Sequence, residues 1–386
     1  MMSNVPKLRF QEFSGEWKKQ KLNQIASKSN SKNKDESICE VFTNSAVNGI
    51  VAQRDFFDKD IANQNNLAGY YIVRHNDFIY NPRISTSAPV GPLNRNHLQT
   101  GVMSPLYTVF TVKDTSVSLE YLERYFKSSK WFKYMYSIAN YGARSDRMSV
   151  TNNDFFAMPI PIPSKQEQEK IASFLTSVDT KIELLVRKEE LLQQYKKGVM
   201  QKIFSQEIRF KADDGSEFPE WEEKKLGEVG KIYQPKTISQ TDLTEEGFDV
   251  YGANGIIGKY SEYNHEFEQI AITCRGNTCG TVNYTKPKSW ITGNAMVVNL
   301  DNSKVVNKMF MYYQLSHSNL TYLITGSGQP QITGDIKTHQ VLVPCLKEQT
   351  KIDNFLSSID SKIAQVSAQL DSTKAFKKAL LQQMFV

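Results

Sequence analysis

One helix-like segment occurs twice in this chain, and the repeat restricts the chain to folds that use two similar long helices. Residues 167–182 (EQEKIASFLTSVDTKI) and 348–363 (EQTKIDNFLSSIDSKI) are identical at ten of sixteen positions, at a constant offset of 181. The similarity resumes at the same offset in 195–204 (YKKGVMQKIF) and 376–385 (FKKALLQQMF). A repeat at a fixed offset indicates one structural unit used twice.

Apolar residues in both segments follow the alternating four-and-three spacing of a coiled coil. Tyr195 and Phe376 are expected to widen this stripe, and Lys196 and Lys377 to weaken it at matching places. Two such stripes in one chain can cover each other, which predicts a long antiparallel two-helix coiled coil. The predicted helix–helix interface consists of Ile171, Leu175, Val178, Ile182, Leu185, Leu192 and Val199 in the first helix, and Ile352, Leu356, Ile359, Ile363, Val366, Leu370 and Leu380 in the second.

A shared opening precedes each half of the chain. Residues 9–22 (RFQEFSGEWKKQKL) resemble 209–226 (RFKADDGSEFPEWEEKKL). Ser164-x-x-Glu167 has the pattern of a capping box at the start of the first helix, and Cys345 takes the place of that serine in the second. The predicted division is an N-terminal segment 1–16, a domain 17–163, a helix 164–206, a linker 207–220, a domain 221–344 and a helix 345–386.

Both domains are predicted to be mixed α/β, with the same order of elements. The order strand, strand, helix, final strand recurs in the two domains, which favours one fold used twice. The first has predicted strands at 76–82, 104–112 and 157–162 and a helix at 118–139; the second has strands at 269–275, 280–285, 295–300 and 340–345 and a helix at 307–324.

Charge and cysteine content narrow the class of protein. Residues 17–163 carry 18 Lys and Arg against 12 Asp and Glu, whereas 221–344 carry 11 against 12, so the net charge of +6 reflects the first domain. That surplus fits nucleic-acid binding, and a solvated basic face explains it equally well. No apolar run is long enough to span a bilayer, and we expect no signal peptide. The four scattered cysteines are expected to be free thiols in a reducing cytoplasm.

Motifs of catalysis are absent from the sequence. Residues 252–260 (GANGIIGKY) lack the glycine spacing of a phosphate loop, and Tyr260 stands where Ser or Thr would bind magnesium. The glycines of 326–330 (GSGQP) follow a helix rather than a strand. No Asn-Pro-Pro-aromatic stretch of an adenine methyltransferase is present, and the five histidines form no ligand pair. We therefore predict no catalytic residue and no metal site.

Loops rich in Arg, Asn, Gln, Ser and Thr instead favour recognition of DNA. Arginine pairs with guanine edges, and asparagine or glutamine with adenine edges. A role in its own turn remains an alternative for each of these residues taken singly. The predicted DNA-binding residues are Arg83, Ser85, Thr86, Tyr141, Arg144, Arg147, Arg275, Asn277, Gln329 and Gln331.

Taken together, these features resemble the specificity subunit of Type I restriction–modification systems over essentially the whole chain. The resemblance rests on the Glu-Trp pairs at 16–17 and 220–221, on 101–110 (GVMSPLYTVF), on the Pro-then-Glu-Gln openings of both helices and on GSGQP. The repeated heptad helix after each variable domain is the most specific of these features.

The resemblance implies two target-recognition domains, each reading one half of an interrupted site in double-stranded DNA. It further implies that the helices hold the domains apart and dock two modification subunits, which bind S-adenosylmethionine and methylate adenine. Separate restriction subunits, each a motor and nuclease, would cleave. The chain itself would then be no enzyme and would hold no cofactor.

Three alternatives remain at this point. One is a self-sufficient methyltransferase or nuclease, which methyl transfer by the purified chain alone would reveal. A second is a coiled-coil scaffold, for which binding to duplex DNA would be absent or insensitive to salt. The third is a stand-alone bipartite DNA-binding protein that co-purifies with no modification subunit.

Overall fold

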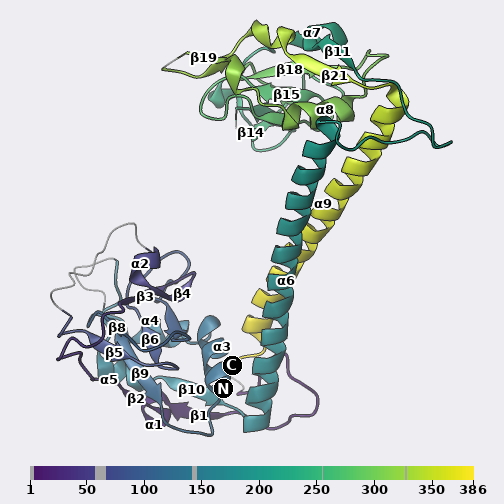
Figure 1. Cartoon of the computed structure of the whole chain (residues 1–386). Coiled ribbons are helices and arrows are strands. Elements are labelled where there is room, and N and C mark those ends of the chain that lie inside the picture. Colours follow the sequence, from purple (N-terminus) through teal and green to yellow (C-terminus); the bar gives the residue numbers. More distant parts are fainter. Residues whose placement is uncertain (1–3, 57–66, 141–145, 254, 327) are drawn as a thin grey trace. The chain divides into compact units, whose positions relative to one another are not determined.

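The computed structural model describes residues 4–56, 67–140, 146–253, 255–326 and 328–386. The chain forms two compact units. Unit 1 contains residues 1–186 and 369–386, and unit 2 contains residues 187–368. Both units are mixed α/β, and each takes one part of both long helices, whereas the predicted division gives each helix a segment of its own (Figure 1).

Unit 1 is built on a four-stranded antiparallel sheet. The strand order is β2 (Ala26–Lys28), β9 (Thr108–Val112), β6 (Phe78–Tyr80) and β7 (Leu93–Arg95). Three strand pairs accompany this sheet: β1 (Lys18–Lys21) with β10 (Pro159–Ile162), β3 (Phe42–Ser45) with β4 (Gly49–Ala52), and β5 (Tyr71–Val73) with β8 (Gly101–Met103). Its short helices are α1 (Leu22–Ile25), α2 (Gln53–Phe56), α3 (Leu119–Lys127), α4 (Phe132–Ile138) and α5 (Asn152–Phe156).

Unit 2 repeats that sheet with other residues. The order is β12 (Lys231–Tyr233), β18 (Ala295–Asn299), β15 (Ile270–Thr273) and β16 (Val282–Tyr284). Smaller sheets pair β11 (Glu222–Lys225) with β21 (Gln340–Val343), β13 (Phe248–Gly252) with β14 (Gly255–Tyr260) and β17 (Trp290–Ile291), and β19 (Ile324–Thr325) with β20 (Gln331–Ile332). The helical elements are α7 (Leu226–Val229), α8 (Lys308–His317) and the 3₁₀ turns η1 (Gln240–Asp242), η2 (Thr321–Leu323) and η3 (Gly334–Thr338).

The prediction of one fold used twice is confirmed by these matching sheets, but two predicted helices are too long. Residues 118–139 form α3 and α4, because the Ser128 hydroxyl donates to the Tyr125 carbonyl at 2.6 Å and ends α3. Residues 307–324 form a helix only as far as His317, where the Ser318 hydroxyl donates to the Gln314 carbonyl. Such local side-chain bonds compete with the helical pattern.

Two long helices, α6 (Lys165–Phe204) and α9 (Leu346–Gln383), each pass from one unit into the other (Figure 1, teal and yellow). In unit 1, α6 begins at the globular part and α9 ends there, with the Phe385 ring 5.6 Å from the Tyr121 ring. In unit 2 the roles are exchanged, and the Phe204 ring lies 6.0 Å from the Phe310 ring. The helices are therefore antiparallel in each unit, as predicted.

The predicted interface residues lie on the covered side of both helices. Ten of the fourteen are buried, and Ile182, Leu192, Val199 and Ile363 are half-buried. Tyr195 and Phe376 are 53% and 52% exposed, so the expectation that they widen the stripe is wrong. In a straight α-helix they lie beside the apolar seam, since Tyr195 follows Leu192 by three residues, and more than half of each side chain stays exposed there.

The first turn of each long helix contains a buried glutamate, which makes equivalent contacts in the two units. Glu167 accepts hydrogen bonds from Arg9 Nε at 2.7 Å and from Trp17 Nε1 at 3.2 Å. Glu348 accepts them from Arg209 Nη2 at 2.9 Å and Trp221 Nε1 at 3.1 Å. In each unit, the arginine of the Arg-Phe pair, the tryptophan of the Glu-Trp pair and the glutamate of the Glu-Gln pair thus form one cluster. Only half of the predicted capping box forms, because Ser164 Oγ accepts from the Glu167 amide while the carboxylate turns to Arg9.

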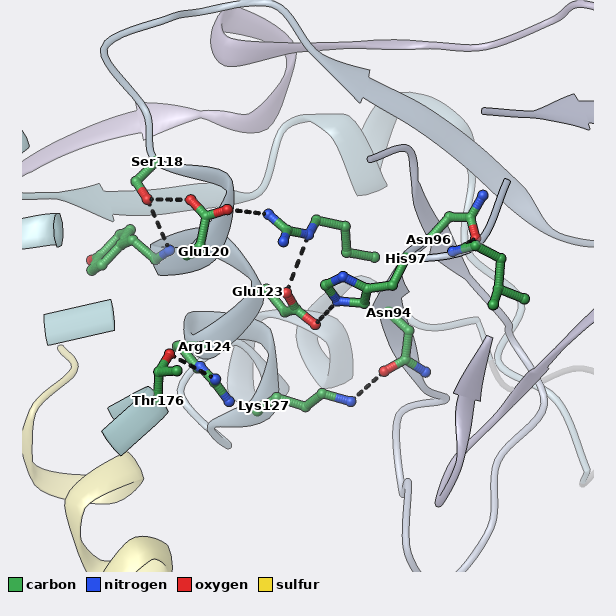
Figure 2. A network of polar contacts seen from close by, with 12 residues as sticks. Asn94, Asn96, His97, Ser118, Glu120, Glu123, Arg124, Lys127 and Thr176 are labelled. Carbon is green, nitrogen blue, oxygen red and sulfur yellow. Dashed lines mark hydrogen bonds and ion pairs between the residues drawn. The ribbon is translucent and has the colours of Figure 1, made fainter. Parts of the chain in front are cut away.

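A polar network ties α3 of unit 1 to the sheet and to α6 (Figure 2). Arg95 of β7 lies 2.8 Å from Glu120 and 3.2 Å from Glu123 of α3. Arg124 donates to Thr176 and forms an ion pair with Asp179, both on α6. These contacts fix the end of α3 against the first half of α6.

Candidate nucleic-acid interface

Those predicted DNA-binding residues of unit 1 that the structure describes lie in two segments that the fold brings side by side. The segment after β6 runs antiparallel to residues 146–148, with Arg83 opposite Arg147. The Ile84 amide donates to the Asp146 carbonyl at 3.0 Å, and the Met148 amide donates to the Pro82 carbonyl at 2.9 Å. Met148 is buried in the core, so it anchors this edge to the body of the unit.

Unit 2 builds the same pairing in the same way. Arg275 lies opposite Gln331, the Gly276 amide donates to the Pro330 carbonyl at 3.1 Å, and the Ile332 amide donates to the Cys274 carbonyl at 3.0 Å. Each bond has its counterpart in unit 1, with Ile332 buried as Met148 is. Arg83 therefore corresponds to Arg275, and Arg147 corresponds to Gln331.

Polar side chains support these edges by hydrogen bonds to the backbone of each unit. In unit 1, Asn44 is buried and donates to the Ile79 carbonyl at 2.8 Å, while Asn81 accepts from the Arg83 amide at 3.0 Å. In unit 2, the hydroxyls of Thr273 and Thr278 donate to the Ala253 carbonyl at 2.9 and 2.8 Å. Loops held in this way present their polar side chains at small conformational cost.

The charged side chains are arranged differently at the two edges. The side chains of Arg83 and Arg147 lie 3.6 and 3.7 Å from the same carboxylate oxygen of Asp146. Asp146 was missed by the sequence reasoning, which searched for donors to bases and not for the acid that orients them. In unit 2, Gln331 replaces the second arginine, and Arg275 has no ion-pair partner among the residues that the structure describes. Each edge therefore carries one unneutralised arginine charge.

Most of the predicted DNA-binding residues are exposed and can contact a large ligand. Of the predicted residues, Arg83, Ser85, Thr86, Arg275, Asn277, Gln329 and Gln331 are exposed, and Arg147 is half-buried. Ser85 also closes a tight turn, because its hydroxyl accepts from the Ala88 amide at 3.2 Å. Tyr141 and Arg144 lie outside the described residues. Guanidinium and amide groups on exposed, anchored loops can form paired hydrogen bonds to base edges.

The acidic side chains, the cysteines and the long helices bear on other classes of site. Within the described ranges, no group of three or more His, Cys, Asp and Glu side chains is placed to hold a metal ion. Cys39, Cys274, Cys279 and Cys345 are all free thiols. Among the helices that the structure describes, none is long and apolar enough to cross a membrane.

Comparison with known families and sequences gives consistent matches. A family described as the type I restriction modification DNA specificity domain matches residues 14–194 and again 219–372. The putative type I restriction enzyme MjaX specificity subunit of Methanocaldococcus jannaschii is 27% identical over 285 residues, which are 68% of this chain and 65% of that protein. The EcoprrI specificity subunit of Escherichia coli is 26% identical over 247 residues, 60% of each chain. The chain thus spans less than two thirds of the length of these relatives.

Solved structures share the fold over nearly the full length. The type I restriction–modification S subunit from M. genitalium aligns with a TM-score of 0.59 at 18% identity and covers 99% of both chains. The HsdS subunit from Thermoanaerobacter tengcongensis aligns with a TM-score of 0.52 at 16% identity and covers 96% of both. At these identities the likeness concerns the fold.

Proposed function

The chain belongs to the family of type I restriction–modification DNA specificity subunits, and on that basis we propose that each unit reads one half of an interrupted DNA site. The observation that carries this proposal is the edge built twice, Arg83 beside Arg147 in unit 1 and Arg275 beside Gln331 in unit 2. Two similar edges with unlike side chains suit two different half-sites. Each mismatched base pair typically costs about 1–3 kcal/mol, and two joined modules add these costs.

The long helices set the distance between the half-sites and dock two modification subunits in this proposal. Since α6 and α9 each belong to both units, their length would set the distance between the two edges in this proposal. Exposed Tyr195 and Phe376 occur at the same place in the two repeats, beside the seam. Exposed aromatic residues are frequent anchors of protein interfaces.

Catalysis is assigned to partner subunits. The modification subunits would bind S-adenosylmethionine and methylate adenine, and separate restriction subunits would cleave. The chain would contribute sequence choice alone and bind no cofactor. This assignment is supported by the family and by the paired residues of the two edges, whose guanidinium and amide groups donate hydrogen bonds.

The test is to express the chain with its modification subunit and to sequence the methylated adenines of the host. We expect one bipartite motif that requires both proteins. A chain whose residues 17–163 come from another family member should change one half of that motif and leave the other half intact. A change in both halves would contradict the modular assignment. A chain that binds a bipartite DNA site with no modification subunit would instead be a stand-alone DNA-binding protein.

A further inference from the structure

A groove in unit 1 combines an apolar floor with a rim of lysines. It has a volume of about 500 Å³ and lies between α3, α4, α6 and α9. Phe132, Ile182 and Leu381 form the apolar part of its lining, and all three are half-buried. The lysines around them are Lys127, Lys374, Lys377 and Lys378. The described residues that line the groove include no carboxylate.

Most of the positive charge of this rim is not neutralised. Lys377 is paired with Asp179 at 2.5 Å, and Lys127 donates to the neutral side chain of Asn94 (Figure 2). Neither Lys374 nor Lys378 has an ion-pair partner among the described residues, and both are exposed. They lie one turn apart on α9, where two like charges repel each other. An anionic partner would relieve this repulsion.

The equivalent places in unit 2 lack half of these lysines. Gln193 stands one repeat before Lys374, whereas Lys196 and Lys197 match Lys377 and Lys378. The caps of α3 and α8 are Ser118 and Asn307, and nine residues after them stand Lys127 and Ser316, respectively. Unit 2 therefore has only two of the four lysines at the places equivalent to this groove.

We propose that the lysine-rimmed groove binds an acidic amphipathic helix of one modification subunit, so that the two copies of that subunit bind with unequal affinity. Such a helix places apolar side chains at i, i+3, i+4 and i+7 into a groove and carboxylates beside them. Its acids would face Lys374 and Lys378, while its apolar side would cover Phe132, Ile182 and Leu381. Duplex DNA would satisfy the lysines but leave these three apolar side chains uncovered. The identity of the partner rests on the proposed function.

The test is a titration of the full-length chain with the modification subunit, followed by native mass spectrometry to count the bound copies. For the unaltered chain we expect two binding steps of unequal affinity. The double variant Lys374→Glu/Lys378→Glu should weaken the tighter step at least tenfold and leave the weaker step in place. Lys374→Gln/Lys378→Gln, which removes charge without reversing it, should weaken the same step less. The matched control Gln193→Glu/Lys197→Glu alters the equivalent places of the other repeat and should leave the tighter step unchanged.

Three outcomes would contradict the groove proposal. Unchanged binding of both copies by the Lys374→Glu/Lys378→Glu variant, with an unchanged circular dichroism melt, would overturn the groove proposal and leave the proposed function intact. Weaker binding to duplex DNA with unchanged binding of the modification subunit would also overturn it, because the groove would then contact phosphates. If the unaltered chain bound no modification subunit, the docking role in the proposed function would fail together with this inference.

Discussion

Lys377 Nζ lies 2.5 Å from Asp179 Oδ1 and joins α9 to α6 within unit 1. One repeat away, Lys196 Nζ lies 2.5 Å from Asp360 Oδ1 and joins α6 to α9 within unit 2. The two lysines are 181 residues apart, and so are the two aspartates. Each helix therefore supplies the lysine of one ion pair and the aspartate of the other. The lysines that the sequence suggested as weak points of the seam therefore contribute to the antiparallel register.

Exchanging the charges of one pair tests this role. Lys196→Asp or Asp360→Lys alone places two like charges together and should destabilise unit 2 by about 1 kcal/mol, since the pair is only partly buried. The double variant Lys196→Asp/Asp360→Lys should recover most of that loss. Urea unfolding of all four proteins gives the coupling energy. Strictly additive losses would show that the pair does not hold the register.

Removing the buried glutamate charge should be more costly. Glu348 is fully buried and is held by Arg209 and Trp221. Glu348→Gln removes the buried counter-charge of the Arg209 guanidinium, which keeps only the exposed carboxylate of Glu220 at 3.2 Å. Breaking such a buried pair costs about 3 kcal/mol. The matched control is Glu222→Gln, because Glu222 pairs with Lys224 on the surface and its side chain is 71% exposed. Thermal unfolding that is equally affected by both substitutions would contradict a structural role for Glu348.

The two edges should act on separate halves of the DNA site. Arg275→Ala and Gln331→Ala should each weaken binding by about 1–3 kcal/mol and relax base choice in one half-site only. Arg83→Ala should relax the other half-site. Binding of the assembled complex to duplexes with single base changes measures both effects. If Arg83→Ala and Arg275→Ala relaxed the same positions, the assignment of one half-site to each unit would be wrong.

Acid should weaken unit 2 through its buried histidines. Burial lowers the pKa of both His265 and His339, which contact the hydroxyls of Tyr233 and Tyr322 at 2.8 and 2.7 Å. The unfolded chain then binds protons more readily, so stability is complete above the ordinary histidine pKa of about 6.5 and falls as the pH drops below it. Urea midpoints between pH 7.5 and 5.5 measure this fall. His339→Gln, which cannot be protonated, should make it shallower, and an unaltered slope would exclude His339 as its source.

Much of the scaffold follows from the sequence because its signals are periodic or repeated. The heptad spacing predicts two long helices, and Ile352 and Leu356 are fully buried where it places them in the interface. The contact between Arg9 and Glu167 could not be predicted in the same way, since 158 residues separate the two partners. The repeat of Arg-Phe, Glu-Trp and Glu-Gln in both halves was the available signal, because motifs repeated together often meet in space.

The candidate interface was predictable in kind but not in geometry. Composition directs attention to the segments that contain Arg83, Arg147, Arg275 and Gln331, yet the pairing of Arg83 with Arg147 depends on how distant segments close over the sheet. Exposure also depends on this closure. Base contact by these residues stays a prediction, and the half-site measurements above test it.

The spacing of the half-sites tests the central claim most directly. The numbers of the paired residues add up to 556 in both ion pairs, so position 188 of α6 stands opposite position 368 of α9 in that register. Four residues inserted after Lys188 and four after Ala368 should lengthen both helices by about 6 Å. Sequencing of methylated adenines should then show both half-sites unchanged and the gap between them longer by about one or two base pairs, because each base pair adds about 3.4 Å. An unaltered gap, or a changed half-site, would contradict the account.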